Sequence, residues 1–250
     1  MSKSAIFESK SGRKIAYHKT IGTEPGVVFL GGFKSDMQGT KATYLESWAH
    51  DKGRAFLRFD YSGHGQSSGR FEDGCIGAWA DDAQEVIEHL TEGPQILVGS
   101  SMGGWIALLM AKLIPQKISG LVGIAAAPDF TEDSMWDGFS EVQKNAIMID
   151  GQLALESEYS DEPYIITKKL IEDGRNQLVL RAPLKLPFPV RFLHGTADAD
   201  VNISVALQIL DHVSGDDVQL TLVKGANHSF SEPENLTMIR RAIHAITMKA

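Results

Sequence analysis

The chain has 250 residues, of which 43% are hydrophobic and 22% are charged, and its formal net charge at pH 7 is −8. This composition is that of an ordinary globular protein and excludes a disordered or fibrous chain. The acidic balance also argues against a nucleic-acid partner, because binding to phosphates requires clustered Lys and Arg side chains.

Cys75 is the single cysteine of the sequence. It rules out an intramolecular disulfide and a multi-cysteine metal site, and it favours a reducing compartment. No apolar run approaches the roughly 20 residues that a membrane span requires, and residues 1–14 lack the pattern of a signal or transit peptide. We therefore predict a cytoplasmic protein without a membrane span, in an oligomeric state that the sequence leaves open.

Apolar runs and turn residues predict strands and helices that alternate over the first half of the chain. Strands are expected at residues 5–8, 14–19, 27–30, 55–59, 95–98 and 118–125, and the first two form a hairpin. Helices are expected at residues 40–50, where Thr40 is the predicted N-cap, and at 76–90 and 105–113. This alternation indicates an α/β fold with a mostly parallel, doubly wound sheet and helices on both faces, which binds ligands at the carboxyl ends of its strands.

The alternation stops between residues 129 and 187, where apolar residues are scattered without the spacing of core strands. We predict a helical insertion here, a lid over the strand ends. The prolines that end it cannot continue a helix, and the pattern then resumes with a strand at 190–193, a helix at 202–213, a strand at 218–223 and a helix at 234–248. The predicted domains are a core of residues 1–128 and 188–250 and a lid of residues 129–187.

Gly99, Ser101 and Gly103 form a G-x-S-x-G motif between an expected strand and an expected helix. A serine in this turn is predicted to adopt unfavourable backbone angles that project its hydroxyl above the sheet, and the glycines leave room for it. Such strain costs about 1–3 kcal/mol and is typical of functional sites. A serine hydroxyl is a weak nucleophile, so it needs a base within reach and a third group that orients the base.

His228 and Asp198 are the candidates for these two roles. On this architecture an acidic residue and then a histidine follow the serine in the chain, each on a loop after a strand, and both residues occupy such loops. His64 is the rival base, although its Gly-rich loop favours a structural role. Asp129 and Asp200 are the rival acids.

The oxyanion of an acyl-transfer intermediate requires two backbone N–H donors. Met102, at the start of the helix after Ser101, and Phe33, after a glycine pair, are predicted to supply them. Gly32 and Lys34 are predicted to lie beside the substrate, with a solvated surface position as the alternative for Lys34. The lid residues predicted to cover an acyl group, unless they pack only among themselves, are Met135, Trp136, Phe139, Ile147 and Met148.

Five short runs carry a family resemblance: KAT at residues 41–43, RFDYSG at 58–63, GPQILVGSS at 93–101, GGW at 103–105 and HG at 194–195. With the G-x-S-x-G motif, they resemble the α/β-hydrolase family, and within it the branch of mitochondrial acyl-glucuronide esterases and S-depalmitoylases. The resemblance implies hydrolysis of small-molecule carboxylic esters or thioesters through an acyl-enzyme. Ser101, Asp198 and His228 would carry out this reaction without a metal ion or an organic cofactor.

Two other functions stay open at this point. An iminopeptidase shares the triad and recognises a charged amino terminus through acids of its lid, for which this lid offers Glu132, Asp133, Glu156, Glu158, Asp161 and Glu162. A non-catalytic receptor or scaffold on the same fold usually has a damaged triad, whereas all three members are present here. A dehalogenase or epoxide hydrolase is disfavoured, because these enzymes need a carboxylate where Ser101 stands.

Overall fold

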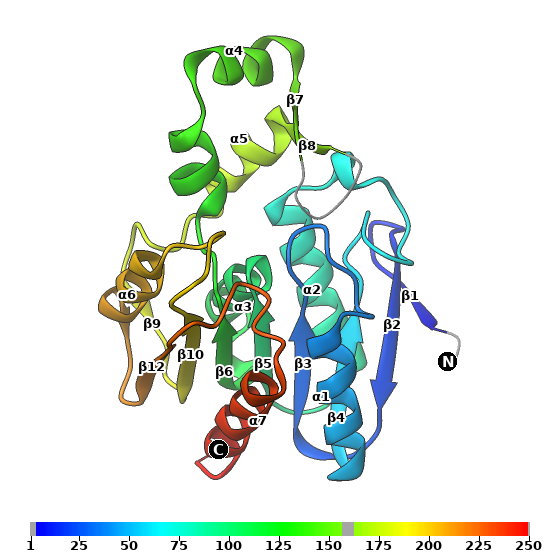
Figure 1. Ribbon diagram of the computed structural model, residues 1–250. Coiled ribbons are helices and arrows are strands. Elements are labelled where there is room, and N and C mark those ends of the chain that lie inside the picture. The colour runs from blue at the N-terminus through cyan, green and yellow to red at the C-terminus, as the bar shows by residue number, and fades with distance from the viewer. Residues whose placement is uncertain (1–3, 157–162, 250) are drawn as a thin grey trace.

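The computed structural model describes residues 4–156 and 163–249. Within these ranges the core is an eight-stranded sheet with the order β1-β2-β4-β3-β5-β6-β10-β12 (Figure 1). Its strands are β1 (Ala5–Glu8), β2 (Lys14–Thr20), β3 (Thr23–Leu30), β4 (Arg54–Phe59), β5 (Gln95–Ser100), β6 (Ile118–Ile124), β10 (Val190–Gly195) and β12 (Val218–Val223).

The sheet is parallel except at one edge. β1 and β2 form an antiparallel hairpin, and β2 also pairs antiparallel with β4. From β4 across to β12 every neighbouring pair is parallel. The loops after these strands therefore meet at one edge of the sheet, and the predicted mostly parallel, doubly wound α/β sheet is confirmed.

Side chains alternate between the two faces of the sheet along each strand, so the apolar strands present hydrophobic residues on both faces. Helices cover both of these faces. Val27 and Phe29 contribute to one hydrophobic core and Val28 and Leu30 to the other. The first core is closed by α1 (Thr40–Asp51) and α7 (Pro233–Thr247). The second is closed by α2 (Ile76–Leu90), α3 (Met102–Leu113) and α6 (Ile203–His212).

The insertion of residues 129–187 contains the π-helix η3 (Thr131–Trp136), the helices α4 (Glu141–Asp150) and α5 (Lys168–Asn176), and the strands β7 (Gln152–Leu155), β8 (Tyr164–Thr167) and β9 (Leu184–Lys185). In Figure 1, α4, β7, β8 and α5 of the insertion stand above the carboxyl ends of the strands, whereas β9 lies lower, beside α6 and β12. The antiparallel pair of β7 and β8 was not expected. Its alternation of exposed and half-buried residues spans only four positions, which is too short to indicate a strand against the scattered apolar residues around it. The division into a core and a lid domain stays a prediction.

The expected N-cap of α1 and the expected start of β3 are wrong. The N-cap of α1 is Gly39 rather than Thr40, because the Gly39 carbonyl already accepts the first helical hydrogen bond, from Thr43 N at 3.1 Å. β3 begins at Thr23, four residues before the expected start, and its pairing with β4 shifts register between Thr23 and Val27. Pro25 lies in that interval and cannot donate to the ladder, so the strand continues only with an irregularity.

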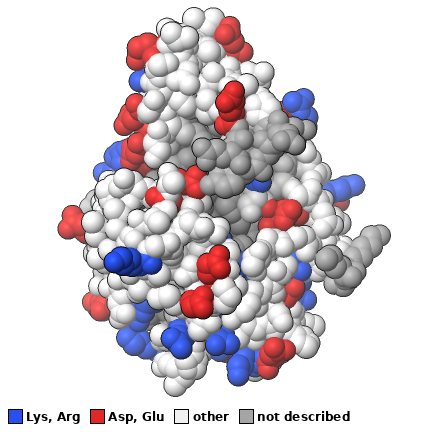
Figure 2. Space-filling view, in the orientation of Figure 1, with Lys and Arg blue, Asp and Glu red and all other residues white. Residues whose placement is uncertain are grey.

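The surface mixes charges of both signs. On the face in Figure 2, Asp and Glu side chains are scattered over the upper part and Lys and Arg gather toward the lower edge, interspersed with acidic groups. Among the described residues, no helix combines the length and the apolar character needed to cross a bilayer. The expectation that the protein has no nucleic-acid partner stays a prediction.

Candidate active site

Ser101 lies in the turn between β5 and α3, at the carboxyl edge of the sheet. Its backbone has φ 55° and ψ −120°, a conformation that residues with a Cβ rarely adopt and that the motif predicts. Ser101 N donates to the Ile124 carbonyl at 2.9 Å, and Ala127 N donates to the Ser101 carbonyl at 3.1 Å. The end of β6 and the loop after it therefore hold the strained turn in place.

The two glycines of the motif are required because a Cβ at either position would clash with neighbouring backbone atoms. A Cβ on Gly103 would lie 2.0 Å from the Leu30 carbonyl oxygen, and one on Gly99 would lie 2.2 Å from the Gly103 carbonyl oxygen. Any side chain at either position would force β3, β5 and α3 apart. Close packing of helix against strand thus explains both glycines beside Ser101.

The structure brings Ser101, His228 and Asp198 together from three loops. His228 Nε2 lies 3.1 Å from Ser101 Oγ, and His228 Nδ1 lies 2.9 Å from Asp198 Oδ2 and 3.1 Å from Asp198 Oδ1. An ionised carboxylate only accepts hydrogen bonds, so Nδ1 carries the proton and Nε2 presents its lone pair to the serine hydroxyl. This is the geometry that lets a histidine act as a general base toward a serine.

The Asp198 carboxylate is fully buried, and its partners keep it ionised. Burial by itself acts to raise its pKa, but the hydrogen bonds from His228 Nδ1 and from the backbone N–H groups of Val201 and Asp200 outweigh burial and hold the pKa below its usual value. Asp198 Oδ1 accepts these backbone bonds at 2.8 Å and 3.0 Å. Asp200, the rival acid on the same loop, is an exposed residue that lines the pocket.

The other two rivals, His64 and Asp129, form their hydrogen bonds with groups other than Ser101 and His228. His64 is buried and accepts a hydrogen bond from Lys34 N at 3.2 Å. Asp129 is fully buried, and its carboxylate accepts the backbone N–H groups of Val179 at 2.8 Å and Leu180 at 3.0 Å. The Asp129 carboxylate therefore links the start of the insertion to Val179 and Leu180, near its end.

Asp129→Ala is expected to lower the free energy of unfolding while leaving the chemistry intact. It removes the acceptor of two buried N–H groups, and each unsatisfied group costs about 1–3 kcal/mol, so we expect a loss of about 2–6 kcal/mol. Urea unfolding measures this loss, and Asp129→Asn, which keeps one acceptor oxygen, should lose less. If Asp129 were instead the triad acid, kcat of the folded variant would fall by about three orders of magnitude or more.

Two backbone N–H groups close to Ser101 in the chain or in space donate no hydrogen bond to the described part of the protein. Met102 is the first residue of α3, so its N–H has no acceptor inside the helix. Phe33 follows Gly32, whose position is so close that a Cβ there would lie 3.4 Å from Ser101 Cβ. Among the described residues the Phe33 N–H donates no hydrogen bond to the protein. Both groups are thus free to receive an oxyanion.

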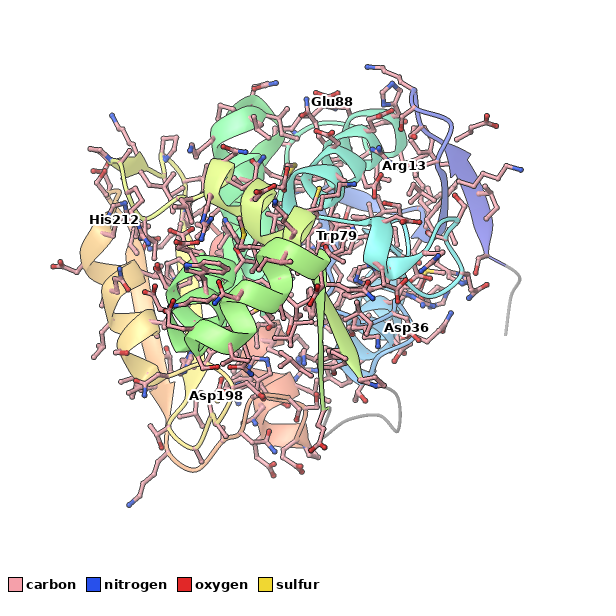
Figure 3. All side chains as sticks on the ribbon, turned by 90° about the horizontal axis from the view of Figure 1, so that it is seen from above. Arg13, Asp36, Trp79, Glu88, Asp198 and His212 are labelled. Carbon is pink, nitrogen blue, oxygen red and sulfur yellow. The ribbon has the colours of Figure 1, made fainter. Side chains whose placement is uncertain are left out.

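A pocket of about 670 Å³ opens at Ser101 and His228. Three of the expected substrate-binding residues line it, namely Gly32, Lys34 and Met135. Asp133 and Asp200, which the sequence indicated for other roles, also line it. The remaining lining includes residues that the sequence did not indicate as part of a pocket: Phe130, Ser134, Tyr164, Val201, Ser204, Val205, Gln208 and Ser229, with Lys41 at the start of α1. Figure 3 views the molecule from above and shows Asp36, another lining residue, and Asp198 on opposite sides of the β7–β8 hairpin.

Four lid residues expected in the pocket are absent from the described lining, which corrects the prediction. Ile147 is fully buried within the insertion, Phe139 packs against the adjoining core, and Met148 is 38% exposed on α4. Trp136 lies between the cations of Lys144 and Arg175, at 5.7 Å and 4.5 Å from the ring centre. The bare pattern of apolar residues could not reveal these orientations, because they depend on how α4 and α5 fold over η3.

Two lysines, Lys34 and Lys41, line the pocket. Lys34 Nζ lies 4.8 Å from the centre of the Tyr164 ring. Burial lowers the pKa of Lys41 to about 8, and its ammonium donates to the Ser229 carbonyl beside His228. Lys41 was missed as a pocket residue, because a lysine in the first turn of a helix looks like a solvated one.

Asp198, Asp200 and His228 each offer an atom within 4.8 Å of one another, the spacing of a metal site. Asp198 and His228 Nδ1 are already hydrogen-bonded to each other. The other imidazole nitrogen, Nε2, which a metal ion could use, faces Ser101 Oγ. The expectation that no metal ion or organic cofactor is needed stays a prediction.

The fold and this group of side chains define a class of protein. A parallel sheet carries a strained serine after β5, an acid after β10 and a histidine after β12, and a family model described as alpha/beta hydrolase fold matches residues 39–154. The chain belongs to the α/β-hydrolase family.

Within this family the chain is similar to the mitochondrial palmitoyl-protein thioesterase ABHD10. It is 37% identical to the Bos taurus protein over 90% of this chain and 74% of the relative, and 35% identical to the Homo sapiens protein over the same shares. The solved structure of alpha/beta hydrolase domain-containing protein 10 from mouse superposes with a TM-score of 0.91 at 32% identity, covering 99% of each chain. A solved structure from Agrobacterium vitis S4 has a TM-score of 0.93 at 39% identity, covering 98% of each chain. The predicted resemblance is confirmed.

The predicted cytoplasmic location is contradicted by these comparisons. The curated relatives that match 90% of the chain are named mitochondrial. The prediction relied on the pattern of residues 1–14 and on a single cysteine, which indicates a reducing environment without distinguishing one compartment from another.

Proposed function

We propose that the protein is a serine hydrolase that cleaves carboxylic esters or thioesters through an acyl-enzyme on Ser101. The observation that carries the proposal is the continuous hydrogen-bonded series from Asp198 through His228 to Ser101 Oγ, at the floor of a pocket of about 670 Å³. The names of the relatives, which are thioesterases, support the thioester part of the proposal.

In the first half-reaction His228 Nε2 takes the proton of Ser101 Oγ as the oxygen attacks the substrate carbonyl carbon. The buried Asp198 carboxylate stabilises the imidazolium that forms. The N–H groups of Phe33 and Met102 receive the oxyanion, and such preorganised donors contribute roughly 10²–10³-fold each to kcat. His228 then gives its proton to the departing alcohol or thiol, which leaves an acyl group on Ser101.

In the second half-reaction water takes the place of the leaving group. His228 removes a proton from the water, whose oxygen attacks the acyl carbonyl, and the tetrahedral intermediate collapses to release the carboxylic acid and restore the Ser101 hydroxyl. A burst of p-nitrophenol followed by slower turnover, with one burst equivalent per active site, tests for the acyl-enzyme. A non-catalytic receptor or scaffold on the same fold would show neither the burst nor the slower turnover.

The iminopeptidase alternative has less support from the lid. Glu132 pairs with Arg175 at 2.7 Å, and Asp133 pairs with Arg181. Acids already neutralised by arginines are poorly suited to bind a charged amino terminus. Three other acids weighed for this function, Glu158, Asp161 and Glu162, lie outside the described residues. Side-by-side turnover of acyl esters, acyl thioesters and aminoacyl amides separates the two activities.

We expect kcat/KM to rise with acyl length until the pocket is full and then to fall. Each buried methylene is worth about 0.8 kcal/mol, which corresponds to a rise of about fourfold. Esters from acetyl to dodecanoyl measure the profile. A flat profile would mean that the apolar lid residues do not contact the acyl group.

Met135 and Trp136 are neighbours that test the lining directly. Met135 lines the pocket and Trp136 does not, so Met135→Ala is expected to change the preferred acyl length. Trp136→Ala is expected to lower the melting temperature and leave the preference unchanged, because it removes packing between Lys144 and Arg175. The opposite pattern would contradict this orientation of η3.

A further inference from the structure

The turn that carries Phe33 has an unfavourable backbone. Ser35 N donates to the Gly32 carbonyl at 3.2 Å, which closes a four-residue turn, and Lys34 at its third position has φ 55°. A positive φ at this position is typical of a type II turn, which normally has glycine there. A residue with a Cβ keeps such a conformation only when its surroundings hold it.

The side chain of His64, from the loop after β4, holds this turn through a hydrogen bond. Its Nε2 accepts the Lys34 N–H at 3.2 Å, and its Nδ1 lies 3.2 Å from the Ser62 carbonyl. A carbonyl only accepts, so Nδ1 carries the proton and Nε2 is the unprotonated acceptor. Burial lowers the pKa of His64, against the opposing effects of the Ser62 carbonyl and Asp82, so the ring is neutral.

The imidazole is itself fixed by its surroundings. The rings of Tyr61, Phe71 and Trp79 meet it nearly edge to face, with centres 5.7, 5.2 and 5.1 Å away. Trp79, which lies centrally beneath the lid in Figure 3, is fully buried on α2. The ring of His64 therefore cannot turn without displacing core aromatics.

The Ser62 carbonyl, which accepts the hydrogen bond from His64 Nδ1, is itself held by its surroundings. Trp79 Nε1 also donates to it at 3.1 Å. Ser62 N and Ser62 Oγ donate to the buried carboxylate of Asp82 at 2.9 and 2.6 Å. A continuous series of hydrogen bonds thus runs from α2 through Ser62 and His64 to the peptide group of Lys34.

Lys34 N belongs to the peptide unit next to the one that carries Phe33 N–H. The peptide unit held by His64 is the one whose flip distinguishes a type II turn from a type I turn. The Phe33 ring packs against two of the three side chains that surround His64, Phe71 at 4.8 Å and Trp79 at 5.9 Å between ring centres. Both the backbone and the side chain of Phe33 are therefore set by the surroundings of His64.

We propose that His64 is a positioning residue for catalysis, which holds the Lys34 N–H and thereby aims the Phe33 N–H at the oxyanion formed on Ser101. The inference rests on the proposed function. It assigns to His64 a contribution to kcat, through transition-state stabilisation, in addition to any contribution to folding. His64 itself touches no substrate atom.

Two substitutions separate the two hydrogen bonds of the ring. His64→Gln places a carbonyl oxygen near the position of Nε2 and keeps the acceptor for Lys34 N–H. His64→Asn places an amide near Nδ1, so it keeps the donor for Ser62 and loses the acceptor. We expect His64→Asn to lower kcat by about 10-fold or more with KM nearly unchanged, below the roughly 10²–10³-fold cost of losing an oxyanion donor outright. His64→Gln should recover most of this loss.

A transition-state analogue gives a second readout. An aryl trifluoromethyl ketone adds to Ser101 and forms a hemiketal oxyanion, whereas the matching methyl ketone binds without adding. In His64→Asn the affinity for the trifluoromethyl ketone should fall by the same factor as kcat/KM, and the affinity for the methyl ketone should not change. Equal kcat in the Gln and Asn variants, or equal losses for both ketones, would overturn the inference.

The wild-type protein supplies a test that does not depend on the variants folding. Histidine ¹⁵N NMR should show His64 as the neutral ring with the proton on Nδ1, and a proton on Nε2 would overturn the inference. Ser101→Ala distinguishes the inference from the proposed function, since activity that survives this change would refute the function itself. With Ser101 established as the nucleophile, a failure in the His64 series counts against the positioning role alone.

Discussion

Ser101→Ala is expected to lower kcat/KM for a p-nitrophenyl ester by at least about 10³-fold, the scale on which triad members act. Alanine keeps the backbone, including its Cβ at φ 55°, and loses only the hydroxyl that lies 3.1 Å from His228 Nε2. The melting temperature should therefore change little. Initial rates on matched amounts of folded protein measure the effect.

Ser134→Ala is the matched control, because Ser134 also lines the pocket but is not hydrogen-bonded to His228. It should retain most of the activity. An alkyl fluorophosphonate should form one adduct, located on Ser101 by peptide mass spectrometry and absent from Ser101→Ala. Retention of a tenth of the activity in Ser101→Ala, or labelling of another serine, would refute the proposed nucleophile.

Asp198→Asn is expected to lower kcat by about 10³–10⁴-fold, while Asp200→Asn changes it only a few-fold. The amide cannot stabilise the imidazolium of His228, and its NH₂ group favours the tautomer in which Nε2 carries the proton and cannot accept one from Ser101. Asp200→Asn is the matched control, since it makes the same chemical change two residues away on the same loop.

The pKa of Asp198 makes this comparison valid over a wide pH range. Burial acts to raise the pKa of Asp198, but hydrogen bonds from His228 and from the loop backbone outweigh it and hold the pKa below its usual value, so the carboxylate is ionised at neutral pH. The loss in Asp198→Asn should thus persist across the neutral and alkaline range, as pH profiles of kcat would show. If Asp200→Asn were the more damaging change, the assignment of the acid would be wrong.

The core elements could be predicted because each leaves a local signal. The buried strand before Ser101 is a continuous apolar run, and α2 occupies the expected residues 76–90 because its apolar positions recur with helical spacing. The order of serine, acid and histidine along the chain then follows from parallel topology, since the loops after parallel strands meet at one edge. That rule selected Asp198 and His228, and the structure brings both to Ser101.

The side-chain orientations within the insertion could not be predicted. Met135 and Trp136 are adjacent apolar residues, yet one faces the pocket and the other lies between two cations. Ile147 and Met148 are likewise adjacent, and one is fully buried while the other is 38% exposed. These differences depend on the packing of η3, α4 and α5, which composition and spacing do not encode.

The sequence by itself determined the strand and helix pattern of the core and the strained turn at Ser101, together with the loops that hold its partners. These features depend on interactions between residues near one another in the chain, or on a topology that has few alternatives. Only the tertiary structure decided which groups surround the turn. His64 reaches Lys34 across 30 positions of sequence, and Lys41 loses hydration because the loop of His228 folds over it. Burial, tautomer and hydrogen-bond partner are properties of a site in three dimensions, so they become defined only when distant segments pack together.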